Sequence, residues 1–560
     1  MKLFVAIVML LFMPACAMFF LGAYSRKEKT KTGFLYLISV IATAVVTLVL
    51  AKGILPEWTI YEVSACAGIA AIVLTFAVAL FNKKIKFSVD TVLRTICFIS
   101  IITAVYSILT YGQARINSDT ATATLLVQSQ IKHGTYFPKS WNYVNGSIWT
   151  IGLAPVVAPF SLLLSNQSLA RMLGSALYVL LTVSGIMYMS KRLFRSDMWT
   201  LAIPLFLVFL TGENEHILYQ GSNTGNMLWL AVNVTLVFLA VNRSRKFFIP
   251  YCIIMIAIST AGIRVYAEQI IPMLSALLLA EFGFNHSSDV VERKRIKRLA
   301  ENAFFVVFPA LIGLLFYKGL CSSHSVNNYA AEFSGNGTVF VNSITECSKN
   351  LSLYVTNLFH CFGYNGGVEL LSLLGIKNLI SIATCCLICF VVPFFQWRSI
   401  KNEEQEVKFL FGYALVHNAI ILVLVVFFGL TTPRYLLSSL FVNVLVSARY
   451  MYAHWLKEKT ISRVFWTCAF SLAAIIECIV IISASKGWKG VVDANKSFNR
   501  YIAERGLDKG YATYWHAYSN SIYSDLGIEY GAFQIRNARL YEYEWLVDSD
   551  TFIPEEKTTF

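Results

Sequence analysis

Long apolar runs separated by short polar segments dominate this chain. A helix needs about 20 apolar residues to cross a hydrocarbon core about 30 Å thick. The runs reach or approach that length and predict about fourteen spanning helices, so the expected fold class is an all-α polytopic membrane protein. The runs lie near residues 3–24, 34–52, 63–81, 91–111, 169–190, 199–211, 225–241, 247–263, 267–282, 303–319, 378–396, 408–430, 435–455 and 464–485. The first has no clear cleavage site before Arg26, so we expect a retained helix.

Lysine and arginine collect in short clusters between these runs, and cytoplasmic loops are enriched in both residues. The clusters are Arg26 to Lys31, Lys83 to Lys86, Lys191 to Arg195, Arg243 to Lys246, Arg293 to Arg298, Arg398 to Lys408 and Lys457 to Arg463. All of them fall on one side only if the apolar segment Ile148 to Leu164 does not cross. Gly152, Pro155 and Pro159 interrupt that segment, which favours a re-entrant or interfacial helix.

This topology places the polar loops and the tail on the extracytoplasmic side. The loops are residues 112–168, 212–224, 320–377 and 431–434. The tail has a helix end at Tyr501 to Arg505, a stop at Gly506 and a short strand over Tyr511 to Trp515, which predicts a small α/β domain. We therefore divide the chain into N-terminal helices at 1–90, a transmembrane core at 91–485 and a C-terminal extracytoplasmic domain at 486–560.

Composition agrees with a membrane protein, because 57% of the residues are hydrophobic and only 14% are charged, against about 25% charged in soluble domains. The net charge of +14 sits in the loop clusters rather than on one stripe, which argues against a nucleic-acid partner. Most cysteines lie in apolar runs as packing residues. Cys321, Cys347 and Cys361 fall in a polar loop, where a disulfide is an open alternative.

Asp119 stands between Ser118 and Thr120, just after a predicted spanning helix. The segment Ser118 to Gln130 has the composition of an amphipathic helix on the membrane surface, and its loop continues through His133, Lys139 and Trp141. Two interpretations are open. Ser118 or Asp119 caps that helix, or Asp119 is a catalytic carboxylate.

Arg434-Tyr435 follows Thr431-Thr432-Pro433 at an outward helix end. The arginine either reaches toward lipid headgroups or binds a phosphate with its planar guanidinium. Arg264 and Glu268, four residues apart, form a second charged pair that either joins two helices inside the membrane or serves function.

Glu213, Glu215 and His216 form the densest polar cluster between two spans. Metal binding, sugar or substrate hydrogen bonding, and a solvated loop are the alternatives for this cluster.

The order of these features resembles the GT-C superfamily of integral-membrane glycosyltransferases, which includes protein O-mannosyltransferases and the lipid A aminoarabinose transferase. The resemblance covers about residues 91–485, and the tail Gly506 to His516 looks like that of uncharacterised bacterial members. Many relatives have two adjacent acids in the first loop, whereas this chain has one, so the sequence leaves open whether a divalent metal takes part. The motifs are Asp119, Phe137-Pro138-Lys139, Trp141-Asn142-Tyr143, Ser168-Leu169-Ala170-Arg171, Lys191-Arg192-Leu193-Phe194 and Pro433-Arg434-Tyr435-Leu436-Leu437.

The resemblance implies a transfer of sugar from a polyprenyl-phosphate donor to a hydroxyl of a cell-envelope acceptor at the outer membrane face. Asp119 would be the general base of an inverting reaction, and the lipid tail of the donor would lie among the helices. Donor-phosphate residues would be Arg434, Tyr435, Lys139 and Arg264, and substrate-binding residues Glu213, Glu215, His216, Glu268, Trp141 and Tyr143. A transporter or flippase of lipid-linked sugars and a polysaccharide polymerase are the alternatives.

Overall fold

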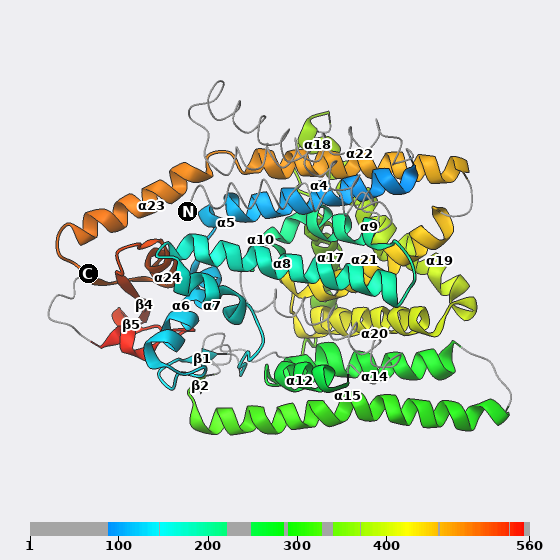
Figure 1. Ribbon diagram of the computed structural model, residues 1–560, viewed down its shortest axis with the longest axis horizontal. Helices are drawn as coiled ribbons and strands as arrows, with labels where there is room; N and C mark the ends of the chain where they lie inside the picture. The colour runs from blue at the N-terminus through cyan, green and yellow to red at the C-terminus, as the bar shows by residue number, and fades with distance from the viewer. Residues whose placement is uncertain are drawn as a thin grey trace, which may run out of the picture.

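The computed structural model describes residues 88–144, 146–220, 248–284, 289–327, 340–369, 371–456, 460–536 and 538–553. The predicted spans before residue 88 and near 225–241 lie outside the described residues. Within the described part the chain is mostly helical, with long helices running side by side and a small sheet near one end of the bundle (Figure 1). This arrangement confirms a helical fold.

Seven helical stretches of the described residues are long and apolar enough to cross a membrane. They are consistent with the prediction of a helical membrane protein, whereas the count of fourteen spans stays a prediction. They are formed by α4 (Val89–Leu109) with α5 (Tyr111–Ala114); α8 (Gln167–Arg192); α15 (Asp289–Ser323); α18 (Leu373–Cys386) with η8 (Leu387–Val391), α19 (Val392–Ser399) and η9 (Ile400–Asn402); α20 (Gln405–Phe428); η10 (Pro433–Leu436) with α21 (Leu437–Tyr450) and η11 (Met451–Trp455); and α22 (Thr460–Ala484) with α23 (Trp488–Ala503).

Other predicted runs form shorter pieces that are not among these seven. The run near 247–263 is interrupted before Ile263, whereas residues 199–209 and 263–283 stay helical, with α- and π-helical turns following one another. The pieces are α9 (Trp199–Pro204), η3 (Leu205–Phe209), η4 (Thr211–Glu213), α10 (Asn214–Ile217), α12 (Phe248–Ser259), α13 (Ile263–Val265), η6 (Tyr266–Ile270), α14 (Ile271–Leu278) and η7 (Leu279–Gly283).

The proline-bearing segment forms the short helix α7 (Ala154–Leu163), with Pro155 in its first turn and Pro159 inside it. Ten residues span about 15 Å, half of the hydrocarbon thickness. Its length therefore agrees with the prediction that this segment does not cross. It packs on α8 and on α6 (Ser118–His133), the helix that carries Asp119.

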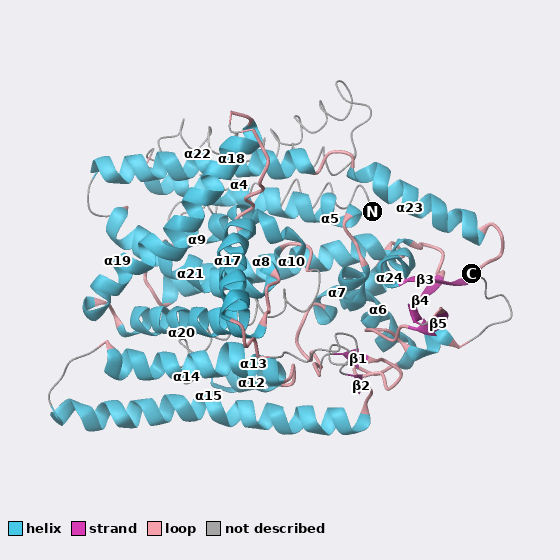
Figure 2. Ribbon diagram, turned by 180° about the vertical axis from the view of Figure 1, so that it is seen from behind, coloured by secondary structure: helices cyan, strands magenta, loops and turns pink. Residues whose placement is uncertain are grey.

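The predicted outward loop 320–377 contains a helix that the sequence pattern did not indicate. This helix, α17 (Ile344–Cys361), runs across the long helices (Figure 2) and packs on α20 and η10. Its mixture of polar and apolar residues falls short of a spanning helix, so the length of apolar runs alone does not indicate it. The described cysteines, including Cys321, Cys347 and Cys361, are free thiols.

The tail forms a three-stranded sheet with a crossover helix, close to the α/β prediction. β3 (Lys509–Thr513) is parallel to β4 (Glu529–Arg536), with α24 (Tyr514–Tyr523) between them, and β4 is antiparallel to β5 (Arg539–Glu542). The short η12 (Ser549–Phe552) follows. The strand predicted over Tyr511 to Trp515 is wrong in its last two residues, because Tyr514 and Trp515 begin α24.

The sheet, α6 and α7 gather at one end of the bundle, and the basic segments at 191–195, 293–298 and 398–408 lie at the other (Figure 1). This separation agrees with the charge argument from the sequence. Which side of a membrane each end faces stays a prediction. A further pair of short strands, β1 (Tyr143–Val144) and β2 (Val326–Asn327), ties the loop after α6 to the end of α15.

Candidate functional site

Asp119 lies in the first turn of α6, and the capping residue of that helix is Asn117. The Asn117 side chain accepts hydrogen bonds from the Thr120 amide and hydroxyl, both at 2.9 Å. The expectation that Ser118 or Asp119 caps the helix is therefore wrong. Since Asn117 already satisfies the free amide, the half-buried Asp119 carboxylate is available for another role, at a helix N-terminus that favours negative charge.

A cavity of about 60 Å³ opens beside Asp119. Trp141 and Tyr143, predicted as substrate-binding residues, line it together with Trp149, Gln220 and Leu546. The pairing of β1 with β2 and a contact between Trp141 and Asp548 fix the backbone of the two predicted aromatic residues. The structure thus brings Asp119, Trp141 and Tyr143 into one site.

Side chains that line this cavity carry buried polar atoms without a hydrogen-bond partner. They are the indole nitrogens of Trp141 and Trp149, the Tyr143 hydroxyl and the Gln220 Oε1. Burial also raises the pKa of Tyr143, so its hydroxyl keeps its proton and remains a donor. Because buried polar groups in native proteins are almost always paired, these atoms indicate a place for water or for hydroxyl groups of a ligand.

Arg171 of α8 holds backbone segments that border this cavity. Its guanidinium is fully buried and donates to the carbonyls of Thr120, Tyr219 and Gln220 and to the Ser175 hydroxyl. Arg171 belongs to the Ser168-Leu169-Ala170-Arg171 motif, for which no separate role was predicted. An arginine inside an apolar run was the signal that could have found it.

Two residues of the tail also contribute to this site, one by contact with Asp119 and one by lining the cavity, which the sequence did not predict. The Tyr514 hydroxyl donates to Asp119 Oδ1 at 2.5 Å, and Leu546 forms part of the cavity wall. The Ser118 hydroxyl in turn donates to the Tyr514 carbonyl. Burial, with the negative charge of Asp119, raises the pKa of Tyr514 far above its usual value, so it is a fixed donor.

A second group of predicted residues, which we call the acid–arginine cluster, comprises Glu213, Glu215, His216, Arg264, Glu268, Arg434 and Tyr435. It is joined to α6 by a hydrogen bond of 2.6 Å from Asn117 Nδ2 to Glu215 Oε1. The cap of the Asp119 helix is therefore also the link between the two groups.

Glu213 is the most perturbed acid of this cluster. Its carboxylate lies 3.6 Å from the imidazoles of His216 and His360. Burial, and then the charge of Glu215, raise the pKa of Glu213 to about 7, while Arg434 acts in the opposite direction. A Cβ on Gly212 would lie 1.7 Å from the His360 carbonyl, so only glycine allows this close approach of η4 to α17.

The Tyr435 ring contacts both predicted phosphate-binding arginines. The guanidinium carbon of Arg264 is 5.1 Å from the ring centroid, and that of Arg434 is 5.6 Å away. Arg264 also pairs with Glu268 at 2.5 Å within one helical stretch. The alternative in which this pair joins two helices is therefore wrong. Arg434 has no carboxylate within ion-pair distance among the described residues, which leaves its guanidinium available to an anion.

Lys139 does not join either group. It is exposed in the turn before Trp141 and makes no ion pair with a described residue. A flexible side chain at such a turn can point to solvent, and the structure gives no support for its assignment to a phosphate.

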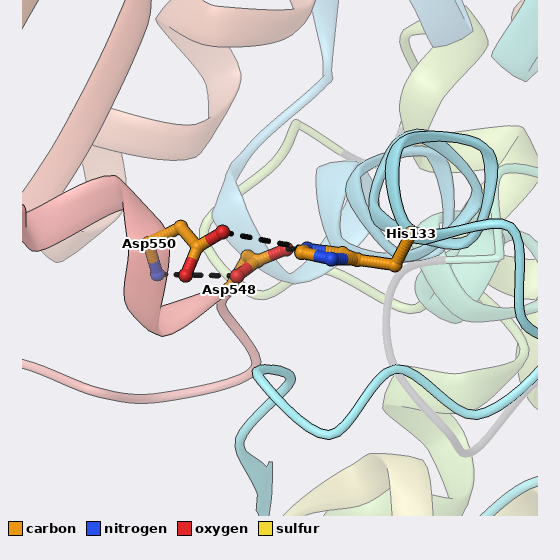
Figure 3. A group of neighbouring side chains, drawn as sticks. All are labelled: His133, Asp548 and Asp550. Atoms are coloured by element: carbon orange, nitrogen blue, oxygen red, sulfur yellow. Dashed lines mark hydrogen bonds and ion pairs between the residues drawn. The ribbon is translucent and has the colours of Figure 1, made fainter.

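A third cluster, which we call the tail interface, comprises Ser129, Lys132, His133 and Ser140 with Asp548 and Asp550 of the tail. His133 Nε2 lies 3.0 Å from Asp548 and 3.5 Å from Asp550 (Figure 3). Ser129 donates to Asp548 at 2.6 Å, and the Lys132 ammonium is 3.3 Å from Asp550. These protein groups already compensate both carboxylates.

Within the described part of the chain, His133, Asp548 and Asp550 form the one group with metal-ligand spacing. Glu213, Glu215 and His216, which the sequence offered as metal ligands, do not converge in this way. The Lys132 ammonium already pairs with Asp550, so the tail interface fits a structural contact better than a metal site.

Neither a protein-family model nor a curated protein matches this sequence.

Proposed function

We propose that the protein is a membrane glycosyltransferase of the GT-C type, which moves a sugar from a polyprenyl-phosphate donor to a hydroxyl of a cell-envelope acceptor. The observation that carries this proposal is the Asp119 cavity. A single carboxylate stands beside unpartnered indole, phenol and amide groups, the kinds of groups that hold sugars by stacking and hydrogen bonding.

Asp119 would act as general base. It accepts the proton of the acceptor hydroxyl while the acceptor oxygen bonds to the anomeric carbon. The bond from that carbon to the phosphate oxygen breaks, and its electron pair stays on the lipid phosphate. Direct attack of this kind inverts the anomeric configuration.

The acid–arginine cluster would receive the phosphate. Arg434 has no ion-pair partner among the described residues, and Tyr435 holds both arginines on one ring. Fixed cations near a leaving phosphate stabilise the charge that develops on it. Glu213, with its pKa raised to about 7, is partly protonated at neutral pH and competes less strongly for Arg434.

The test is turnover of a lipid-linked sugar by purified protein in detergent or liposomes. Asp119→Asn should lower kcat by about 10² to 10⁴-fold, and Arg434→Gln should weaken use of the donor. Asp525→Asn is the matched control, because Asp525 pairs with Lys496 on the exposed surface of the tail. Full turnover by Asp119→Asn would exclude Asp119 as the base.

One observation favours transport as a second candidate. Glu477 of α22 is fully buried in a spanning segment, and neither carboxylate oxygen has a hydrogen-bond partner. Lys377 of α18 is also buried and donates to the Gly363 carbonyl. Ionisable groups at such positions often mark ion or solute pathways. Movement of lipid-linked sugar across liposomes without release of polyprenyl phosphate would favour this candidate.

A further inference from the structure

We propose that Tyr514 of the tail is a positioning residue for Asp119, so that the C-terminal domain completes the site. This inference rests on the proposed function, since it gives the tail a part in the same reaction. It concerns how the base is held and not which sugar is moved.

The contact between Tyr514 and Asp119 makes the two carboxylate oxygens of Asp119 different. Oδ1 accepts the Tyr514 hydroxyl, and Oδ2 accepts no hydrogen bond from a described residue. A base that removes a proton needs one oxygen free and the carboxylate fixed in orientation. The Tyr514 hydroxyl fixes the orientation of the carboxylate and leaves Oδ2 free to take up the proton.

The position of Tyr514 is fixed from both sides of the contact. Its ring packs edge-on against Trp515, Tyr518 and Tyr543, with centroids 5.0 to 5.4 Å apart. Its carbonyl accepts the Ser118 hydroxyl from the residue before Asp119. The donor and the carboxylate are thus held in register by a backbone contact as well as by their own hydrogen bond.

The rest of the tail holds this arrangement against the loop after α6. The Asn142 amide donates to the Val547 carbonyl at 2.9 Å, and the Ser549 amide donates to the Ser140 carbonyl at 2.8 Å. Leu546, in the same stretch, closes one wall of the Asp119 cavity. The tail therefore supplies a donor to the base and a wall to its cavity.

Tyr514→Phe tests the inference, because it removes the hydroxyl and keeps the ring. Tyr518→Phe is the matched control, since Tyr518 is one turn further along α24 and its hydroxyl donates to the Tyr543 carbonyl instead. We expect Tyr514→Phe to lower kcat by about tenfold to a hundredfold, with the KM for the donor changed less than about twofold, because the carboxylate then loses the orientation in which it removes the proton. Tyr518→Phe should keep both values within about twofold.

A double-mutant cycle separates positioning from a general structural effect. In the Asp119→Asn background, Tyr514→Phe should cause no further loss of kcat, because the two residues act as one unit. A multiplicative further loss, or a wild-type kcat for Tyr514→Phe alone, would overturn the inference.

Hydrogen exchange tests the contact without any donor. Tyr514→Phe should speed amide exchange in the first turns of α6, and Tyr518→Phe should not. Equal exchange in Tyr514→Phe and wild type would overturn the inference whatever the activity. Absence of turnover in the wild-type protein would instead overturn the proposed function, so the two failures are distinguishable.

Discussion

Glu213 and Asp548 are both buried beside histidine, yet the protein compensates their charges in opposite ways. Both side chains belong to residues that are 8% exposed. Burial and Glu215 raise the pKa of Glu213 to about 7. Burial also opposes ionisation of Asp548, but hydrogen bonds from Ser129, the Asp550 amide, Ser140 and His133 outweigh it and hold its pKa below the usual range.

This difference distinguishes a structural contact, the tail interface, from a candidate binding site. In the tail interface, donors from the protein already satisfy the carboxylates, so these carboxylates do not need a ligand. The acid–arginine cluster and the Asp119 cavity keep poorly compensated groups, which is costly for the folded protein unless a ligand or water meets them. Such incomplete compensation is typical of functional sites.

The largest effect on stability should come from the tail interface. Asp548→Ala removes the acceptor for Ser129 and His133 and should lower the free energy of unfolding by about 2 kcal/mol. Chemical unfolding in detergent micelles measures this change. Asp525→Ala, which breaks the exposed pair with Lys496, should cost less than about 1 kcal/mol. Equal losses for the two variants would mean that the tail interface stabilises the protein no more than an exposed ion pair does.

Glu213 should make stability depend on pH near neutrality. An acid whose pKa is raised in the folded state stabilises that state at low pH, and this stability is lost as pH rises through the folded pKa, here about 7. Between pH 6 and 8 the wild-type protein should therefore lose about 1 kcal/mol. Glu213→Gln should flatten this slope, which thermal unfolding at several pH values measures.

Asp548 provides the control for that slope. Its pKa is lowered from 3.8, so its stability contribution is present above pH 3.8 and is lost only as pH falls through the lower, folded value. Asp548→Asn should therefore leave the slope between pH 6 and 8 unchanged. A slope unaltered in Glu213→Gln would show that another group titrates there.

The smallest effect on stability should come from the cavity. The Trp141 indole N–H has no partner, so Trp141→Phe should change the free energy of unfolding by less than about 0.5 kcal/mol from the lost N–H. Trp199→Phe is the matched variant, since Trp199 is equally buried and donates to Asp197 at 2.9 Å. It should cost about 1 kcal/mol more. The reverse order in the unfolding measurements would mean that the Trp141 indole is already satisfied.

The sequence identified those features that depend on neighbouring residues. Apolar runs of spanning length predicted the long helices, and two prolines predicted that the segment of α7 stays short. Asp119, Trp141 and Tyr143 fall in one loop, so their common cavity was within reach of a local argument. The capping residue of α6 could not be predicted in this way, because Asn117, Ser118 and Asp119 can all accept a backbone hydrogen bond.

Contacts between distant segments could not be predicted. Tyr514 lies 395 positions from Asp119, and Asp548 lies 415 positions from His133, so no periodicity relates them. Adjacency was misleading in the opposite sense for Glu213, Glu215 and His216. Only Glu213 and His216 of these three meet, together with His360, while the Glu215 side chain turns to Asn117.

The contact of Ser118 with Tyr514 can form only late during synthesis of the protein on the ribosome. Ribosomes add roughly 5 to 20 residues per second, so about 20 to 80 s pass between synthesis of the first turn of α6 and arrival of its partner. During that interval the helices can enter the bilayer while the carboxylate at their end has no tyrosine beside it. A chain that stops before residue 514 would contain the helices of the bundle but would lack the tyrosine beside Asp119.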